Sequence, residues 1–216
     1  MDYATARFNM IEGQIRPNGV TDAVVLEAMS AVPREKFVPR HLRTVAYTDE
    51  DLPLGKGRVL MEPMVCARLL QSAAVAPGDV VLEIGAGSGY ITSVLSRMAS
   101  TVVAVESEPD FAAQAVSTLA SLGVDNAAVV SGKLPEGCPA QGPYDIIFVN
   151  GAVSAVPESL LQQLADGGRL ISVVDCVGQG TAFRYVRSGK TIGSRPVFDA
   201  NVPLLPEFQK QQAFVF

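Results

Sequence analysis

Residues 80–90 read Val-Val-Leu-Glu-Ile-Gly-Ala-Gly-Ser-Gly-Tyr, and this stretch decides the fold. Its four apolar residues and one acid predict a buried strand, and its three glycines predict a tight turn. Residues 91–98 then place apolar side chains at helical spacing. A glycine turn between a strand and a helix leaves the N–H groups at the helix start free to bind a ligand.

The spacing of the glycines separates two classes of nucleotide cofactor. A dinucleotide site has the pattern G-x-G-x-x-G, but here Tyr90 occupies the last position and the glycine comes one residue earlier, at Gly89. Glu83 would repel a pyrophosphate and attract the ammonium end of S-adenosyl-L-methionine. A second acid, Glu106, ends the strand expected at residues 101–106, where a carboxylate can accept both ribose hydroxyls. The pattern favours S-adenosyl-L-methionine over NAD; the alternative is a purely structural glycine turn.

The composition describes a globular chain and argues against several kinds of partner. The chain has 216 residues, of which 48% are hydrophobic and 18% charged, with a formal net charge of −5. This charge does not suit phosphate neutralisation, so we expect no nucleic-acid partner. No apolar run reaches the ~18–20 residues of a membrane span, and the amino terminus lacks a signal pattern, so no membrane partner is expected.

Cysteine and histidine usage bears on redox chemistry and metals. Cys66, Cys138 and Cys176 lie far apart without C-x-x-C spacing, which is typical of reduced thiols in a cytoplasmic protein. His41 is the single histidine of the chain. A surface or packing role suits it better than a metal site or a histidine base, so we expect no metal. The sequence does not indicate an oligomeric state.

Alternating strand and helix patterns after residue 76 predict the fold class. We expect an α/β fold with a doubly wound, Rossmann-like parallel sheet and helices on both faces. The expected strands are residues 80–84, 101–106, 127–131, 144–149 and 169–174, and the expected helices are 91–98, 109–122 with Ser107 as N-cap, and a helix opened by Pro157. Ligands of such sheets bind at the carboxyl ends of the strands, which places Asn150 beside Glu83 and Glu106.

The two ends of the chain are expected to differ from this core. We expect residues 1–76 to form an amino-terminal helical cap and substrate loop, and residues 77–216 to form the methyltransferase core as one compact unit. The cap is expected to hold a helix before Pro17, a helix over 22–31 with Thr21 as N-cap, a loop or pair of short strands over 47–58, and a helix over 64–74. Near the carboxy terminus, residues 182–187 and 191–198 predict an antiparallel hairpin, and 213–216 offer a further strand.

Three segments of the sequence resemble the protein-L-isoaspartate O-methyltransferase family. The first runs through residues 10–16, 19–22, 26–29, 32–39, 46–47 and 52–55; the second is the glycine turn, 83–90; the third is 143–145 with Pro157, 163–164 and 167–170. The resemblance covers nearly the whole chain. Its amino-terminal segment is specific to this family, whereas the glycine turn is shared by many methyltransferases.

The resemblance implies a fold, a reaction and a set of cofactor contacts. It implies methyl transfer from S-adenosyl-L-methionine to the α-carboxylate of an L-isoaspartyl residue in a peptide or protein, the step that begins protein repair. It also implies that Glu106 holds the ribose of the cofactor. The methionine part is assigned by motif to Glu83, Gly85, Gly87, Ser88 and Gly89, and the wider set of cofactor-binding candidates adds Ala86, Tyr90, Lys133, Leu134 and Asn150.

The chain departs from the family pattern in its substrate loop. Where the family usually carries Gln-Thr-Ile-Ser, this chain has Arg58-Val59-Leu60-Met61, so a threonine and the hydroxyl associated with catalysis are missing. Arg58, Val59 and Met61 are the candidate substrate-loop residues. Arg58 either anchors a carboxylate with its fork of N–H groups or is a solvated loop arginine. Val59 and Met61 are either substrate contacts or packing residues.

A second departure affects the adenine site. The family usually has Gly-Asp after the third strand, and this chain has Gly132-Lys133. Lysine only donates hydrogen bonds, so Leu134 or backbone groups are left to hold adenine. After the fourth strand, residues 150–152 read Asn-Gly-Ala where the family favours small alanines.

Three functions therefore stay open at the level of sequence. The first is a carboxyl methyltransferase acting on isoaspartyl residues, which needs no general base because a carboxylate is already a nucleophile. The second is a methyltransferase with a different acceptor. The third is a non-catalytic relative that has kept the S-adenosyl-L-methionine site.

Overall fold

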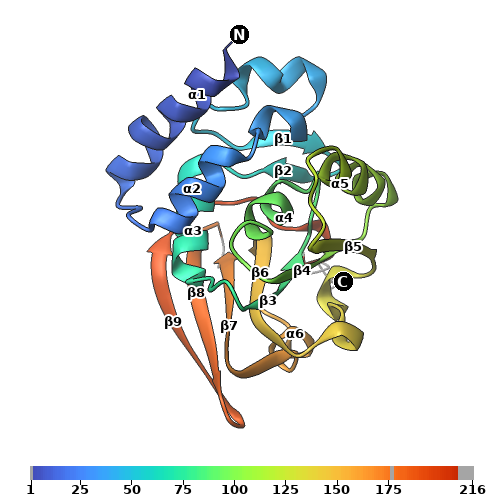
Figure 1. The fold of residues 1–216 in the computed structure, drawn as a ribbon. Coiled ribbons are helices and arrows are strands. Elements are labelled where there is room, and N and C mark those ends of the chain that lie inside the picture. The colour runs from blue at the N-terminus through green and yellow to red at the C-terminus, as the bar shows by residue number, and fades with distance from the viewer. Residues whose placement is uncertain (1, 176–177, 209–216) are drawn as a thin grey trace, which may run out of the picture.

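A seven-stranded sheet forms the centre of the molecule (Figure 1). The computed structural model describes residues 2–175 and 178–208. The strands lie in the order β5-β4-β3-β6-β7-β8-β9. Their bounds are β3 Val80–Ile84, β4 Thr101–Glu106, β5 Ala127–Ser131, β6 Tyr144–Val153, β7 Leu164–Asp175, β8 Gly180–Ser188 and β9 Thr191–Asp199. The pairs from β5 to β7 are parallel, and β8 and β9 pair antiparallel.

The order of the strands confirms the doubly wound sheet and the carboxy-terminal hairpin. From β3 the chain first proceeds outward to β4 and β5, and then returns to place β6 on the other side of β3. The strand order therefore reverses between β3 and β6. In open α/β sheets such a reversal marks the ligand-binding crevice, at the carboxyl ends of the strands.

Helices and the amino-terminal cap cover the two faces of this sheet. The helices that flank the sheet are α3 Pro63–Ala73, α4 Tyr90–Leu95, α5 Pro109–Ser121 and α6 Glu158–Leu161. Successive residues of one strand point to opposite faces: Val81 packs with α3, α4 and the cap, whereas Leu82 packs with α6 and Leu205. Both faces of the central strands are therefore buried, as their continuous apolar runs predict.

The amino-terminal cap lies over one end of the sheet (Figure 1). It comprises α1 Tyr3–Met10, a π-helical turn Ile11–Ile15, 3-10 turns at Arg16–Asn18, Arg34–Phe37 and Arg40–Val45, α2 Ala23–Ala31, and the hairpin of β1 Leu52–Gly55 with β2 Arg58–Leu60. One apolar cluster runs from Met10 in the cap to Phe148 in the sheet. The division of the chain at residue 76 stays a prediction, because cap and sheet share this cluster.

Several expected boundaries were wrong. Asp22, not Thr21, caps α2, since its carboxylate accepts the N–H groups of Val24 and Val25 at 2.9 and 3.4 Å. Ser107 does not cap α5; the cap residue is Glu108.

Strand and helix lengths also differ from the expectation. β7 begins at Leu164 rather than at residue 169, β6 continues to Val153, and α4 ends at Leu95. The strand offered by residues 213–216 and the thiol of Cys176 lie outside the described residues. Among the helices of the described ranges, none has the length and apolarity that a membrane span requires.

Candidate functional site

The glycine turn joins β3 to α4 at the predicted place. The N–H groups of Gly85 and Ala86 both donate to the Val105 carbonyl, at 2.8 and 3.2 Å, which fixes the turn against β4. Gly89 has φ +90, and a Cβ there would lie 3.0 Å from the Cβ of Ala115 in α5. Gly89 therefore permits close packing of the turn against α5, whereas Gly85 faces Arg58 and Leu205.

Glu83 ends up buried at the floor of the turn with both oxygens bonded. Thr92 donates its hydroxyl to Oε2 at 2.6 Å, and the side-chain amide of Asn150 donates to Oε1 at 2.9 Å. Burial raises the pKa of Glu83 to about 7, although the two hydrogen bonds and the Arg58 charge oppose the rise. A cation placed beside this carboxyl would favour its charged form.

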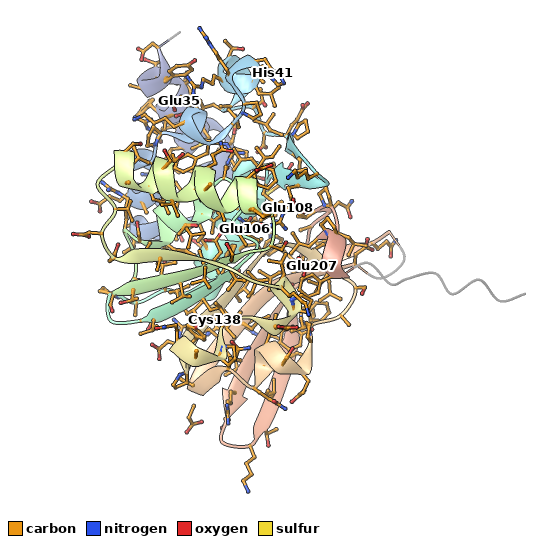
Figure 2. The ribbon with its side chains drawn as sticks, turned by 90° about the vertical axis from the view of Figure 1, so that its right-hand side faces the viewer. Glu35, His41, Glu106, Glu108, Cys138 and Glu207 are labelled. Atoms are coloured by element: carbon orange, nitrogen blue, oxygen red, sulfur yellow. The ribbon has the colours of Figure 1, made fainter. Side chains whose placement is uncertain are left out.

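Glu106 (labelled in Figure 2) lies at the carboxyl end of β4, as predicted, and its two oxygens accept from four donors. Oε1 accepts the N–H groups of Ser107 and Glu108, each at 2.9 Å. Oε2 accepts a hydrogen bond from the N–H of Gly87 at 2.6 Å. Nη2 of Arg58 also donates to Oε2 and forms an ion pair with it. The carboxylate proposed for a ribose is thus occupied by the chain's own donors.

Arg58 is a buried side chain in the cleft, so its interpretation as a solvated loop residue was wrong. A Cβ on Gly85 would lie 3.2 and 3.3 Å from Nη1 and Nη2 of Arg58 and 3.4 Å from Leu205. Nη1 has no hydrogen-bond partner among the described residues. The guanidinium therefore rests on the glycine turn with unused donor capacity.

A carboxy-terminal segment that the sequence did not assign to the site closes the cleft from the other side. The backbone of Ala152 exchanges hydrogen bonds with Pro203 and Leu205, at 3.1 and 2.9 Å. The carboxylate of Glu207 (labelled in Figure 2) accepts the N–H of Leu134 at 3.0 Å. A Cβ on Gly151 would lie 2.6 Å from Cγ of Leu205, so only glycine fits there. The apolar run 203–206 hints at burial, but no local signal says where it docks.

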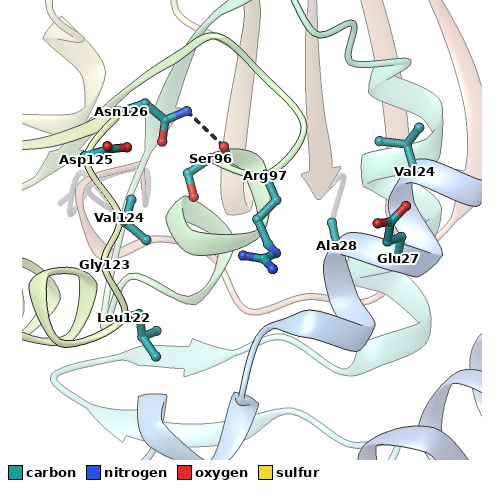
Figure 3. Close-up of a pocket in the computed structure, with 10 residues that line it drawn as sticks. All are labelled: Val24, Glu27, Ala28, Ser96, Arg97, Leu122, Gly123, Val124, Asp125 and Asn126. Atoms are coloured by element: carbon teal, nitrogen blue, oxygen red, sulfur yellow. Dashed lines mark hydrogen bonds between the residues drawn. The ribbon is translucent and has the colours of Figure 1, made fainter.

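The cleft that these residues leave is small. Its volume is about 10 Å³, and it is lined by Gly57, Arg58, Val59, Gly85, Gly87, Asn150, Gly151, Pro203 and Leu205. A cavity of this size holds about one water molecule. A wider pocket of about 470 Å³ lies between α2, the residues that follow α4 and the residues between α5 and β5 (Figure 3). That pocket shares no lining residue with the cleft, and neither Glu83 nor Glu106 lines it.

The residues at the glycine turn fit S-adenosyl-L-methionine in chemistry. Two carboxylates flank backbone N–H groups, and the first two glycines allow close approach. In this conformation the side chains of Arg58 and Leu205 lie directly over Gly85, where they block the approach of a ligand to the turn. The cofactor assignment therefore requires both side chains to move.

Three further candidates from the sequence, Lys133, Tyr90 and Ser88, do not line the cleft. Lys133 points to solvent and pairs with Glu136 at 3.0 Å, and the side chain of Tyr90 packs on Phe37 and under Arg34. Ser88 is buried, and its hydroxyl has no partner in the described part of the chain.

Met61 also faces the core rather than the cleft. It is buried in the apolar cluster of the cap, and its carbonyl accepts Nη2 of Arg34 at 2.5 Å. Val59 is the other substrate-loop candidate, besides Arg58, that lines the cleft. Thr92, which bonds Glu83, was missed because a threonine within a helix gives no local signal of a site.

Comparison with known proteins assigns the chain to a family. Residues 6–204 match the sequence model of the family described as protein-L-isoaspartate(D-aspartate) O-methyltransferase (PCMT). The chain belongs to the protein-L-isoaspartate O-methyltransferase family. Two relatives that carry this name support the assignment. The protein from Roseiflexus castenholzii is 40% identical over 206 residues, 95% of this chain and 94% of the relative, and that from Methylorubrum extorquens is 42% identical over 189 residues, 88% and 82% of the two chains.

Solved structures share the fold of this family member. A protein-L-isoaspartate O-methyltransferase superposes with a TM-score of 0.81 at 27% identity, over 92% of this chain and 65% of that one. A Plasmodium falciparum chain in complex with S-adenosyl-L-homocysteine superposes with a TM-score of 0.79 at 21% identity, over 96% and 99% of the two chains. The PCMT fold, its cap and its antiparallel carboxy-terminal strands are therefore shown.

Proposed function

We propose that this chain is an S-adenosyl-L-methionine-dependent carboxyl methyltransferase that acts on L-isoaspartyl residues of peptides or proteins. The observation that carries the proposal is the placement of Glu83 and Glu106 on either side of a glycine turn, at the strand-order reversal of a PCMT-family sheet. The cysteine usage of the chain suits a cytoplasmic protein.

The cofactor residues are assigned by their chemistry. Glu83 would hold the positively charged methionine part, because a buried carboxyl with a raised pKa gains its charge beside a cation. Glu106 would accept the ribose hydroxyls once Arg58 leaves it. Gly85 and Gly87 let the backbone approach the ligand closely.

Methyl transfer to a carboxylate asks little acid–base work of the protein. When bound, S-adenosyl-L-methionine would supply a methyl group: a carboxylate oxygen forms a bond to the methyl carbon as the carbon–sulfur bond breaks, and the electron pair of that bond stays on sulfur. No proton moves, so the chain has to align the acceptor and exclude water. Pro203 and Leu205 border the cleft, and their segment would exclude water once the Leu205 side chain has moved to admit the cofactor.

The experiment is a methylation assay with labelled S-adenosyl-L-methionine and two peptides that differ only in L-isoaspartyl or L-aspartyl at one position. We expect a base-labile methyl ester on the isoaspartyl peptide alone. No ester at micromolar enzyme would contradict the proposal.

A different acceptor is the second candidate function. Val59 and Met61 stand where the family has hydroxyls, and Met61 is buried away from the cleft. A screen of other acidic peptides and small carboxylic acids for methyl esters separates this candidate from the first. The variant Val59→Thr, at the loop position that lines the cleft, should raise isoaspartyl transfer by about 10²–10³-fold if the new hydroxyl acts as a preorganised donor. An unchanged rate would show that a hydroxyl at this position does not limit isoaspartyl transfer.

A further inference from the structure

Arg58 and Glu106 form a buried ion pair on the ribose side of the cleft. Their side chains are 4% and 0% exposed. Taking two charges out of water is costly unless their hydrogen bonds are complete. Glu106 meets this condition with its three backbone donors and Arg58, but Arg58 does not, because its Nη1 has no partner within the described residues. One member of the pair is therefore left with a free donor beside the cleft.

The position of the guanidinium makes it a competitor of the cofactor. Arg58 occupies Oε2 of Glu106, the oxygen that also receives the Gly87 N–H, and it fills the space above Gly85. About 10 Å³ remains next to it. A ribose can reach the Glu106 carboxylate only after Arg58 has moved.

The hairpin that carries Arg58 is held at its tip by weak contacts. Lys56 in the turn forms ion pairs with Glu108 and Asp110, each at 2.9 Å. The side chains of all three residues are exposed, so these ion pairs contribute little to stability. The pairing of β1 with β2 is irregular between Pro53 and Gly55. The tip of the hairpin is therefore attached less firmly than its base, where Leu52 and Leu60 are buried.

We infer that Arg58 is shared between Glu106 and the methyl acceptor: it pairs with Glu106 in the cofactor-free protein, and ribose hydroxyls release it to bind the acceptor carboxylate. The inference rests on the proposed function. The guanidinium fork matches a carboxylate with two parallel N–H groups, and Arg58 lines the cleft together with Val59, whose side chain offers no hydrogen-bond donor. The cofactor then binds first, and its binding promotes acceptor binding through one side chain.

Titration calorimetry with S-adenosyl-L-homocysteine and the L-isoaspartyl peptide tests this coupling. The wild-type chain should bind the peptide about tenfold more tightly, or about 1.4 kcal/mol, when the nucleoside is saturating. Arg58→Gln removes the charged competitor and keeps a side chain that donates hydrogen bonds. It should bind S-adenosyl-L-homocysteine about tenfold more tightly than wild type and show no coupling to the peptide.

Lys56→Gln is the matched control, because it removes a positive charge from the same hairpin without contacting Glu106. Both of its affinities should stay within about twofold of wild type. Equal nucleoside affinity of wild type and Arg58→Gln, with coupling kept in the variant, overturns the inference and leaves the proposed function intact. Absence of nucleoside binding in both proteins overturns both.

Hydrogen exchange of the wild-type hairpin, residues 52–60, decides the matter if Arg58→Gln does not unfold cooperatively. Faster exchange of this hairpin on adding S-adenosyl-L-homocysteine supports the release of Arg58. Unchanged exchange with the nucleoside bound overturns it.

Discussion

The side-chain amide of Asn150 donates to the carboxyl of Glu83 across 2.9 Å, joining β6 to β3 at the floor of the cofactor cleft. The hydroxyl of Thr92 reaches the other oxygen at 2.6 Å. Despite these two bonds, burial raises the pKa of Glu83 to about 7, because desolvation outweighs them. The cleft therefore holds a carboxyl that changes charge near neutral pH.

Glu83→Gln should change how stability depends on pH. The folded pKa of about 7 lies above the ordinary 4.5, so the folded chain binds more protons than the unfolded chain between these values, and the stability of the wild type falls as pH rises through them. The variant lacks this loss. Its free energy of unfolding, relative to that of the wild type, should therefore rise by about 3 kcal/mol from pH 4.5 to pH 7.5. Urea unfolding across this range measures it, and parallel pH profiles of the two proteins would contradict the prediction.

Gly89→Ala should destabilise the chain more than an alanine at another left-handed glycine. The added Cβ would lie 3.0 Å from Ala115 Cβ and 3.3 Å from its backbone Cα, at φ +90. Gly123→Ala is the control, since Gly123 has φ +69 and nothing within 4 Å of the added atom. We expect a cost of about 1 kcal/mol for the control and about 2–4 kcal/mol for Gly89→Ala. Equal thermal shifts would show that α5 gives way freely.

Leu205→Ala should weaken the fold and open the cleft. Leu205 is buried against Gly85 and Gly151, and its loss should cost about 2–5 kcal/mol in urea unfolding. The same change removes a side chain that the nucleoside must displace, so S-adenosyl-L-homocysteine should bind about tenfold more tightly. Leu204→Ala is the matched control, because that side chain packs in the other apolar cluster. A similar gain in affinity for the control would argue against a specific role of Leu205.

Arg34 supports the substrate loop from the cap side. It is fully buried, donates to the carbonyls of Ala46 and Met61 at 2.7 and 2.5 Å, and lies 4.9 Å above the centre of the Tyr90 ring. Arg34→Met leaves both carbonyls without these donors and should cost about 2–4 kcal/mol in urea unfolding. Arg40→Met, at an exposed position, should change stability by less than about 0.5 kcal/mol. A variant as stable as wild type would show that the carbonyls find other donors.

The glycine turn shows how far local pattern carries. The run of apolar residues ending at Ile84 and the glycines after it predicted a strand, a turn and a helix, and the structure has each. The positions of both acids in their strands were predicted correctly: Glu106 ends β4, and Glu83 lies one residue before the end of β3. Errors concentrated at caps: Thr21 and Asp22 are adjacent polar residues of similar capping power, so sequence alone could not choose between them.

The filled cleft was decided by the tertiary structure. Arg58 meets Glu106 across 48 residues of sequence, and Leu134 meets Glu207 across 73. Hydrophobic periodicity determined which face of each strand and helix is buried, and thereby the sheet and its glycine turn. It carries no information on which buried charge a distant hairpin or a terminal segment will reach, because that depends on how complete elements pack against one another. The sequence by itself therefore determined a methyltransferase scaffold with two acids, and only the packing of β2 and residues 203–208 onto it decided that Arg58 and Leu205 stand in the cleft.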